Sequence, residues 1–237
     1  MKPTAAVKEF SRFAHSYNSY NIIQDEVAKT LISLLAKSTY DKVIDIGCGS
    51  GAVYKYLLQK NVRVSEFIAI DSSTQMLEVH PEHPSVTKIC ADFNAEDGFL
   101  FMSDENSLII SASALQWSKD LDFTFSNLAK KSPQAYFAIF TANTFKTIHT
   151  ISGAKSPIYS IEQLQQNIQK YYKANFQIRQ YKLHFLSARE MFRYIKKSGV
   201  SGGEKQLSYK AIKSLMNTYP LDYLEFEVLF VRAKTLS

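Results

Sequence analysis

Residues Val43 to Leu57 read VIDIGCGSGAVYKYL and are the most informative segment of the chain about its fold. An apolar run carries Asp45 near its end and then breaks into alternating glycines, after which apolar residues recur at helical spacing. These glycines are Gly47, Gly49 and Gly51. A strand, a glycine-rich loop and a helix in this order let the backbone come unusually close to a ligand. With Ala52 the loop also meets the loose dinucleotide pattern G-x-G-x-x-G/A, which alone leaves the ligand open.

The composition sets bounds on the class of protein. With 237 residues and 46% hydrophobic content, the chain can bury a sizeable core, and we expect a single elaborated domain over residues 1–237. It has no run of eighteen apolar residues and opens on MKPTAAVKEF, without a secretory stretch. Cys48 and Cys90 lack metal-ligand spacing, so we expect free thiols, no metal and a reducing cytoplasmic compartment. The net charge of +6 suggests an acidic partner without naming it.

Strand-like runs then alternate with helix-like runs along the first 141 residues. We expect strands at Lys42–Ile46, Glu66–Asp71, Val86–Cys90, Ser107–Ser111 and Ala135–Thr141. A helical pattern covers residues 21–37, within an expected N-terminal helical segment over residues 1–40. This alternation predicts an α/β fold with a mostly parallel sheet and helices on both faces. Ligands of such sheets bind beyond the carboxyl ends of the strands, where the glycine loop lies.

The last third of the chain has a different pattern. Phe176–Leu186 and Leu224–Ala233 are long strand-like runs, expected to pair antiparallel at one edge of the sheet. Helices are expected between them, near Ala188–Lys197 and Ser208–Asn217. Residues 145–172 and 187–218 are therefore interpreted as helical insertions. Capping-box spacing predicts helix starts at Ser72, Ser160 and Ser187.

Two carboxylates, Asp45 and Asp92, separate the possible ligands of the glycine loop, whereas Asp71 fits a dinucleotide and S-adenosylmethionine alike. Asp45, two residues before the first glycine, would repel a pyrophosphate but favour a cation that carries a sulfonium and an ammonium. Asp71 ends the second strand, where it can accept hydrogen bonds from ribose hydroxyls. Asp92 and Phe93 follow the third strand, where they can bind and pack an adenine. Together these residues favour S-adenosylmethionine over a dinucleotide as the ligand. Further candidate cofactor-binding residues are Gly47, Gly49, Gly51, Ser72, Met76 and Ser111.

Together with this motif, stretches spread over nearly the whole chain resemble one family. They are FSRFAHSYNSYNIIQ (Phe10–Gln24), SASALQW (Ser111–Trp117), TFKTIHT (Thr144–Thr150), MFRYIKKSGV (Met191–Val200) and YPLDY (Tyr219–Tyr223). The glycine motif resembles the Rossmann-like class I S-adenosylmethionine-dependent methyltransferases in general. The other stretches resemble, among these, the malonyl-[acyl-carrier protein] O-methyltransferases. The chain departs from that pattern at Ala112, where the family usually has asparagine, and at Pro133-Gln134, which replaces a Pro-Gly turn.

The resemblance implies methylation of the free carboxylate of a malonyl thioester, the step that starts pimeloyl assembly in biotin synthesis, with S-adenosylhomocysteine as the second product. A carboxylate is already ionised at neutral pH, so the reaction needs no general base and no metal. We expect an N-terminal lid and an acceptor side formed by the two helical insertions. The candidate catalytic residues, as donors to the acceptor, are Tyr17, Gln116, Trp117 and His149, and Arg12 is a candidate partner of the cofactor's carboxylate.

The resemblance also implies an acyl-carrier protein, or coenzyme A, as the bearer of the malonyl group. Carrier proteins are acidic, and the expected helix Ala188–Lys197 places basic residues apart from an apolar face of Met191, Phe192 and Ile195. The candidate carrier-binding residues are Arg189, Arg193, Lys196 and Lys197. No membrane and no nucleic acid is expected as a partner.

Three other readings stay open. One is a carboxyl or other O-methyltransferase that acts on small molecules without a carrier. A second is a nucleic-acid methyltransferase, favoured by the charge but lacking an Asn/Asp-Pro-Pro-aromatic segment or a Pro-Cys pair after the fourth strand. The third is a cofactor-binding protein without catalysis.

Overall fold

The computed structural model describes residues 21–101, 106–197 and 215–236. In this part of the chain, a sheet of seven strands has the order β3-β2-β1-β4-β5-β7-β6. The strands are β1 (Thr39–Ile46), β2 (Arg63–Asp71), β3 (Val86–Cys90), β4 (Ser107–Ala112), β5 (Gln134–Phe140), β6 (Tyr172–His184) and β7 (Tyr223–Thr235). The first five run parallel to one another, and β7 runs antiparallel to both β5 and β6. The sheet is therefore mostly parallel with an antiparallel edge.

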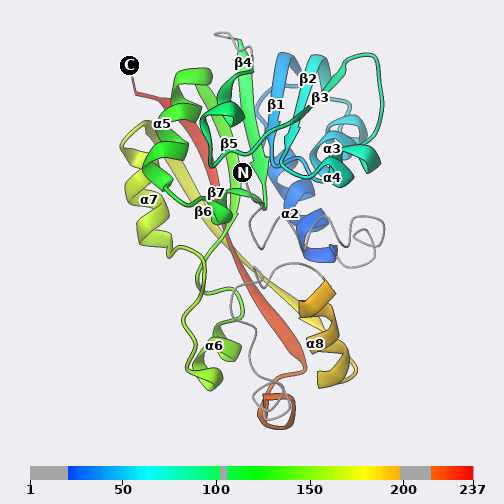
Figure 1. Cartoon of the computed structure of the whole chain (residues 1–237), viewed down its shortest axis with the longest axis vertical. Coiled ribbons are helices and arrows are strands. Elements are labelled where there is room, and N and C mark those ends of the chain that lie inside the picture. The colour runs from blue at the N-terminus through cyan, green and yellow to red at the C-terminus, as the bar shows by residue number, and fades with distance from the viewer. Residues whose placement is uncertain (1–20, 102–105, 198–214, 237) are drawn as a thin grey trace.

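Helices cover both faces of this sheet (Figure 1). Their bounds are α2 (Ile22–Ser33), α3 (Ala52–Gln59), α4 (Thr74–Val79), α5 (Leu121–Lys131), α6 (Lys146–Ser152), α7 (Ile161–Gln169) and α8 (Ala188–Lys197), with 3₁₀ turns η2 (Glu96–Phe99) and η3 (Leu115–Trp117). Successive strand residues point to opposite faces, so each strand feeds two cores. On β5, Phe140 packs in the core shared with α2 and α3, whereas Phe137 packs in the core shared with α5 and α7.

The predicted strands and their pairing are confirmed. Val86–Cys90 has the predicted bounds, and the other strands overlap their predicted ranges, most extending by one to four residues at an end. The two long strands of the last third pair antiparallel, with β7 between β5 and β6. The helix over Ala188–Lys197 also has its predicted bounds. The helix expected near Ser208–Asn217 lies mostly outside the described residues, and its end at 215–218 is helical.

One predicted helix start was wrong. Ser73, and not Ser72, caps α4, and its Oγ accepts a hydrogen bond from the N–H of Met76 at 3.3 Å. The reason is that Asp71 fixes the backbone after β2 by accepting the N–H of Ser73, which delays the first helical turn by one residue. The capping box at Ser160 is confirmed, and the Oγ of Ser187 accepts the N–H of Glu190 at 3.2 Å.

The long strands β6 and β7 extend past the other strands to one end of the molecule, where α6 and α8 lie (Figure 1). Tyr194 of α8 is buried there, with its ring centroid 6.4 Å from that of Phe226 on β7 and 5.4 Å from that of Phe185. The predicted apolar face of α8 therefore includes Tyr194, which the sequence reading omitted. The insertion 145–172 splits in two, since α6 lies at this end while α7 packs beside α5 on the sheet.

Candidate functional site

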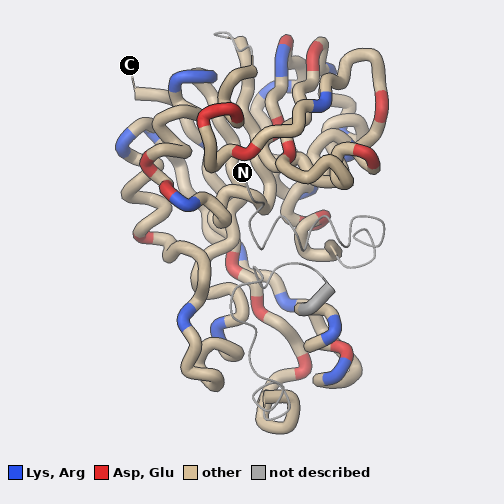
Figure 2. Tube along the Cα trace, in the orientation of Figure 1, with Lys and Arg blue, Asp and Glu red and all other residues tan. Residues whose placement is uncertain are grey.

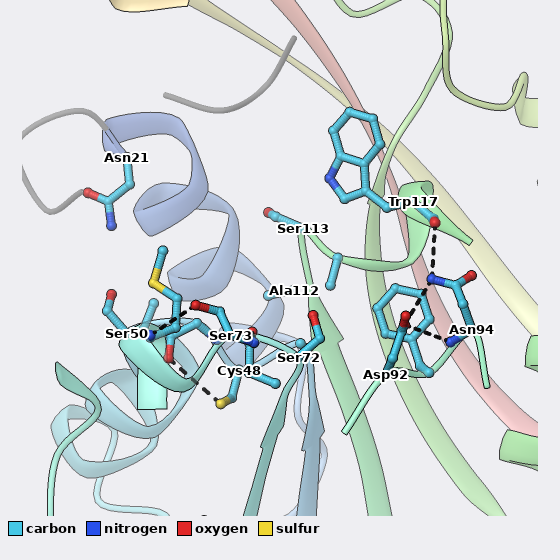
Figure 3. Close-up of a pocket in the computed structure, with 17 residues that line it drawn as sticks. Asn21, Cys48, Ser50, Ser72, Ser73, Asp92, Asn94, Ala112, Ser113 and Trp117 are labelled. Carbon is cyan, nitrogen blue, oxygen red and sulfur yellow. Dashed lines mark hydrogen bonds between the residues drawn. The ribbon is translucent and has the colours of Figure 1, made fainter. Parts of the chain in front are cut away.

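A pocket lies at the carboxyl ends of β1, β2, β3 and β4, on both sides of β1, which stands at the switch in strand order. Its empty volume is about 850 Å³, including the part open to solvent. This volume falls in the range of sites for a nucleotide-sized ligand. Its lining residues are Asn21, Gly47, Cys48, Gly49, Ser50, Ala52, Asp71, Ser72, Ser73, Met76, Asp92, Phe93, Asn94, Ala112, Ser113, Ala114 and Trp117 (Figure 3).

The glycine loop between β1 and α3 forms one wall of the pocket. Gly47 donates its N–H to the carbonyl of Ile70 at 2.8 Å, which ties the loop to β2. A Cβ on Gly47 would lie 2.3 Å from the Cβ of Ala114, so no side chain fits there. Gly49 has φ of +53° and a Cβ on it would meet no atom within 4 Å, so its backbone faces open space. The loop thus offers bare backbone to a ligand, as a close approach requires.

Asp71 braces this loop from the end of β2. Its Oδ2 accepts the N–H of Gly49 and its Oδ1 accepts the N–H of Ser73, each at 2.9 Å. Burial raises the pKa of Asp71, and the hydrogen bonds from these backbone amides pull the pKa back down. The carboxylate therefore stands at a fixed place in the pocket wall, where it can also accept hydrogen bonds from a ribose.

Asp45 lies beneath the loop and does not line the pocket. Its side chain is fully buried, and within the described residues neither carboxylate oxygen has a hydrogen-bond partner. Burial raises the pKa of Asp45 well above its usual range, and the charge of Asp71 raises it further. A cation bound at the loop would favour the ionised form of both acids and so lower their pKa values again. The residues present therefore fit the sulfonium of S-adenosylmethionine, with Asp71 in the pocket wall and Asp45 beneath the loop.

The opposite wall comes from the loops after β3 and β4. Asp92 accepts the N–H of Asn94 at 2.9 Å and its side-chain amide at 3.1 Å. The same amide reaches the carbonyl of Trp117 at 3.4 Å, and the oxygen of Asn94 accepts the N–H of Lys119 at 2.7 Å. Figure 3 shows Asn94 between the two loops. Asn94 therefore fixes the Trp117 loop relative to the predicted adenine-binding loop.

Many of the predicted cofactor residues come together in the pocket. Those that line it are Gly47, Gly49, Asp71, Ser72, Met76, Asp92 and Phe93. Gly51 lies just outside, where it precedes α3 with φ of +91°. Ser111 is buried on β4 and donates its hydroxyl to the carbonyl of Ile46 at 2.7 Å, a bond between strands. Arg12 lies outside the described residues.

Of the predicted acceptor residues, Trp117 lines the pocket. Gln116 is buried beside it and donates its amide to the carbonyl of Ser113 at 2.7 Å. His149 lies on α6, away from the lining residues, and burial lowers the pKa of its imidazole. Tyr17 lies outside the described residues.

The predicted carrier-binding residues Arg189 and Arg193 are exposed on α8, at the end of the molecule where β6 and β7 extend (Figures 1 and 2). The backbone of Lys196 and Lys197 completes the same helix. The described charges at this end include Glu190 on the same helix, so the surface is mixed, with a basic majority on the exposed face of α8.

Several lining residues were missed by the sequence reading. Cys48, Ser50 and Ala52 belong to the glycine loop itself, and Asn94 stands two residues after Asp92, an Asx-turn spacing that could have signalled it. Asn21, Ser73 and the turn from Ala112 to Ala114 join the pocket through the packing of separate segments. No local pattern marks them.

Residues 43–131, which include the glycine loop and most of the pocket wall, match the family model described as a methyltransferase domain. The chain is an S-adenosylmethionine-dependent methyltransferase. Its mostly parallel sheet, the glycine loop after β1 and the acid at the end of β2 form the Rossmann-like class I fold of these enzymes, as predicted.

The similarity to curated relatives extends over most of this chain. It is 28% identical to the malonyl-[acyl-carrier protein] O-methyltransferase of Bacteroides thetaiotaomicron, over 88% of this chain and 82% of the relative. It is 26% identical to the enzyme of the same name from Bacillus cytotoxicus, over 93% of this chain and 85% of the relative. The predicted resemblance is confirmed.

Solved structures agree with the fold. Phosphoethanolamine N-methyltransferase 2 of Haemonchus contortus, in complex with S-adenosyl-L-methionine, matches with a TM-score of 0.54 and 17% identity. The match covers 87% of this chain and 52% of that one. At this identity the likeness concerns the fold, and the acceptor has to be argued from the site.

Two further observations concern the described residues alone. None of their helices is both long and apolar enough to cross a membrane. In the same ranges, no three histidine, cysteine, aspartate or glutamate side chains gather where they could hold a metal ion. The cytoplasmic location stays a prediction.

Proposed function

We propose that the methyltransferase methylates the free carboxylate of a malonyl thioester, carried by an acyl-carrier protein or by coenzyme A. The product would be the methyl ester that starts pimeloyl assembly in biotin synthesis. The observation that carries the proposal is the likeness to two malonyl-[acyl-carrier protein] O-methyltransferases over 88% and 93% of this chain. The pocket chemistry supports it independently.

When bound, S-adenosylmethionine supplies an electrophilic methyl group on a sulfonium. The bound cofactor would supply this methyl group to a carboxylate oxygen of the acceptor and would leave as S-adenosylhomocysteine. No proton moves, because the acid has a pKa near 4 and is already ionised. The enzyme's task is to align the reacting atoms and exclude water, which can contribute about 7–11 kcal/mol in well-oriented systems.

The titratable groups that line the pocket have roles other than proton abstraction. Asp71 accepts two backbone amides, and Asp92 accepts the amides of Asn94. Burial raises the pKa of the Cys48 thiol well above its usual range, so the thiol stays protonated at neutral pH. We assign none of these groups to deprotonate the acceptor, because a carboxylate arrives already ionised.

Trp117 is the described donor best placed for that anion. Its indole Nε1 is buried and, among the described residues, has no hydrogen-bond partner. An indole N–H can only donate, so the ligand that pairs with it has to bring an acceptor atom. We assign Trp117 to the acceptor side, and Tyr17, Gln116 and His149 remain predicted contributors. Arg12 remains the predicted partner of the cofactor's carboxylate.

The exposed face of α8 is proposed to meet the carrier. Arg189 and Arg193 are four residues apart on one exposed side of the helix, while Met191 and Tyr194 are buried on the other. Exposed charges of this kind steer encounter with an acidic partner more than they add affinity. The carrier would approach from the end of the molecule where α6 and α8 lie.

The deciding experiment offers labelled S-adenosylmethionine with malonyl-acyl-carrier protein, malonyl-coenzyme A, acetyl-coenzyme A and tRNA as separate acceptors. We expect base-labile label on both malonyl thioesters and none on acetyl-coenzyme A, which lacks the carboxylate. Label on free dicarboxylates alone would favour a small-molecule carboxyl methyltransferase. Label on tRNA, or tight cofactor binding without turnover on any acceptor, would contradict the proposal.

A further inference from the structure

The turn after β4 holds a serine in a conformation that serines rarely adopt. Ser113 has φ of +62°, in the left-handed region that favours glycine and asparagine. Such a conformation is strained and persists only where the surrounding structure imposes it. Strain of this kind at a pocket wall is a reason to ask what the side chain does.

The surroundings hold Ser113 from several directions. Its N–H donates to the carbonyl of Ala138 on β5 at 2.8 Å, and its carbonyl accepts the buried amide of Gln116 at 2.7 Å. The next residue, Ala114, packs so closely on Gly47 that a single added carbon would collide with it. The turn is therefore clamped between β5 and the glycine loop, and the direction of the Ser113 side chain is set.

Among the described residues, the hydroxyl so placed has no hydrogen-bond partner. The Oγ of Ser113 is buried and, like Nε1 of Trp117, makes no hydrogen bond within the described residues. Both residues line the pocket, and in Figure 3 both polar atoms turn toward the side on which Asn21 lies. Two unpaired buried polar groups in one wall cost stability, which a ligand that pairs with both would recover.

We propose that Ser113 is a second donor to the acceptor carboxylate, beside Trp117, and that it helps to select an acid over an uncharged acyl group. This inference rests on the function proposed above. A carboxylate has two oxygens and can accept from both donors at once, which a neutral acyl methyl cannot. Hydrogen bonds to a charged acceptor are also about twice as strong as neutral ones.

The neighbours of Ser113 cannot take this role. The hydroxyl of Ser111 is bonded to the carbonyl of Ile46, and Ala112 and Ala114 offer no polar atom. Ser113 is thus the residue of the β4 turn whose side chain can donate into the pocket. Gln116 acts as a positioning residue, because its amide holds the carbonyl of Ser113.

Two substitutions distinguish the effect of the Ser113 hydroxyl from the effect of the backbone conformation. Ser113→Gly removes the hydroxyl and tolerates the positive φ, so the fold should be kept or slightly stabilised. Ser113→Asn also tolerates the left-handed region and restores a polar donor. Thermal melting of both variants, with S-adenosylmethionine affinity by calorimetry, shows whether the turn and the cofactor site are intact.

Trp117 is the single tryptophan of the chain, so its fluorescence reports on the site directly. The protein, saturated with S-adenosylhomocysteine, is titrated with malonyl-coenzyme A and with acetyl-coenzyme A. We expect the wild type to prefer the malonyl thioester, and Ser113→Gly to lose about tenfold in affinity for it. Affinity for acetyl-coenzyme A should not change, and Ser113→Asn should recover part of the loss.

The outcomes are distinct. If Ser113→Gly keeps the full preference for the malonyl thioester, the inference is wrong while the proposed function stands. If the substitution weakens S-adenosylmethionine binding and leaves the preference intact, Ser113 serves the cofactor instead, and the inference is again wrong. If the wild type shows neither preference nor methylation of a malonyl thioester, both the inference and the proposed function fall.

Discussion

Asp71 is the residue whose change tests the cofactor site most directly. Its two carboxylate oxygens each accept one backbone N–H, from Gly49 in the glycine loop and from Ser73 at the start of α4. Asp71→Asn preserves the shape of the side chain but replaces one oxygen with an amide that donates. One of the two backbone N–H groups would then face another donor, and the glycine loop would lose part of its support.

The expected magnitude follows from that loss. A hydrogen bond to a charged group contributes about 1.5–3 kcal/mol, so one lost bond should weaken S-adenosylmethionine binding by about 10-fold to 150-fold. Any loss of a ribose hydrogen bond to the carboxylate adds to this. Asp71→Ala should cost at least as much, because it leaves both backbone amides without this partner.

Isothermal titration calorimetry measures the affinity, with thermal melting as the check that each variant is folded. Asp92→Asn is the matched control, since Asp92 lines the same pocket and carries the same charge, but its side chain accepts hydrogen bonds from Asn94 in its own loop. We expect a smaller, few-fold loss for the control. Unchanged affinity in a folded Asp71→Asn protein would refute the reasoning, and equal losses in both variants would mean that only the charge of the pocket matters.

Three further outcomes are expected. Burial raises the pKa of Asp45 above its value in the unfolded chain. The stability that this group contributes is therefore present below the unfolded pKa and is lost as the pH rises through the folded pKa. We expect the melting temperature of ligand-free Asp45→Asn to fall less than that of the wild type between acid and neutral pH. Gly47→Ala should destabilise the fold more than Gly49→Ala. Both substitutions cost about 1–2 kcal/mol for the positive φ, but only the Cβ at position 47 collides with a neighbour. Equal free energies of unfolding in denaturant would contradict the close packing at Gly47. Arg193→Glu should raise the KM for malonyl-acyl-carrier protein about twofold to fivefold at low salt and leave the KM for malonyl-coenzyme A unchanged. Lys130→Glu, at an exposed position of α5, is the charge-matched control. Equal effects on both thioesters would place Arg193 outside carrier docking.

The order of strands and helices could be predicted because it depends on local pattern. Strand-like runs alternate with helical spacing, and the five parallel strands they form have five to nine residues. Asp45 and Asp71 stand at or next to the carboxyl ends of β1 and β2. The glycine loop could be predicted for the same reason, since positive φ and close approach demand glycine in the sequence itself. From these features the cofactor followed.

The division of roles within the pocket was decided by tertiary structure. The sequence marks both Asp45 and Asp71 as candidate cofactor-binding residues, but the fold buries Asp45 beneath the loop and leaves Asp71 in the pocket wall. Ser111 likewise turned out to bond to β1. The reason is that burial and hydrogen-bond partners depend on what packs from other segments, which spacing along one strand does not contain.

The acceptor side of the pocket is where prediction from the sequence was least complete. Trp117 could be named from the sequence, but the turn that aims Ser113 into the pocket exists only because β5, Gln116 and the glycine loop meet there. Its φ of +62° is imposed by those contacts against the preference of serine. Local periodicity and the positions of the glycines were enough to predict the fold and the cofactor. Which side chains face the methyl acceptor was decided by long-range packing, because only packing can hold a residue against its own conformational preference.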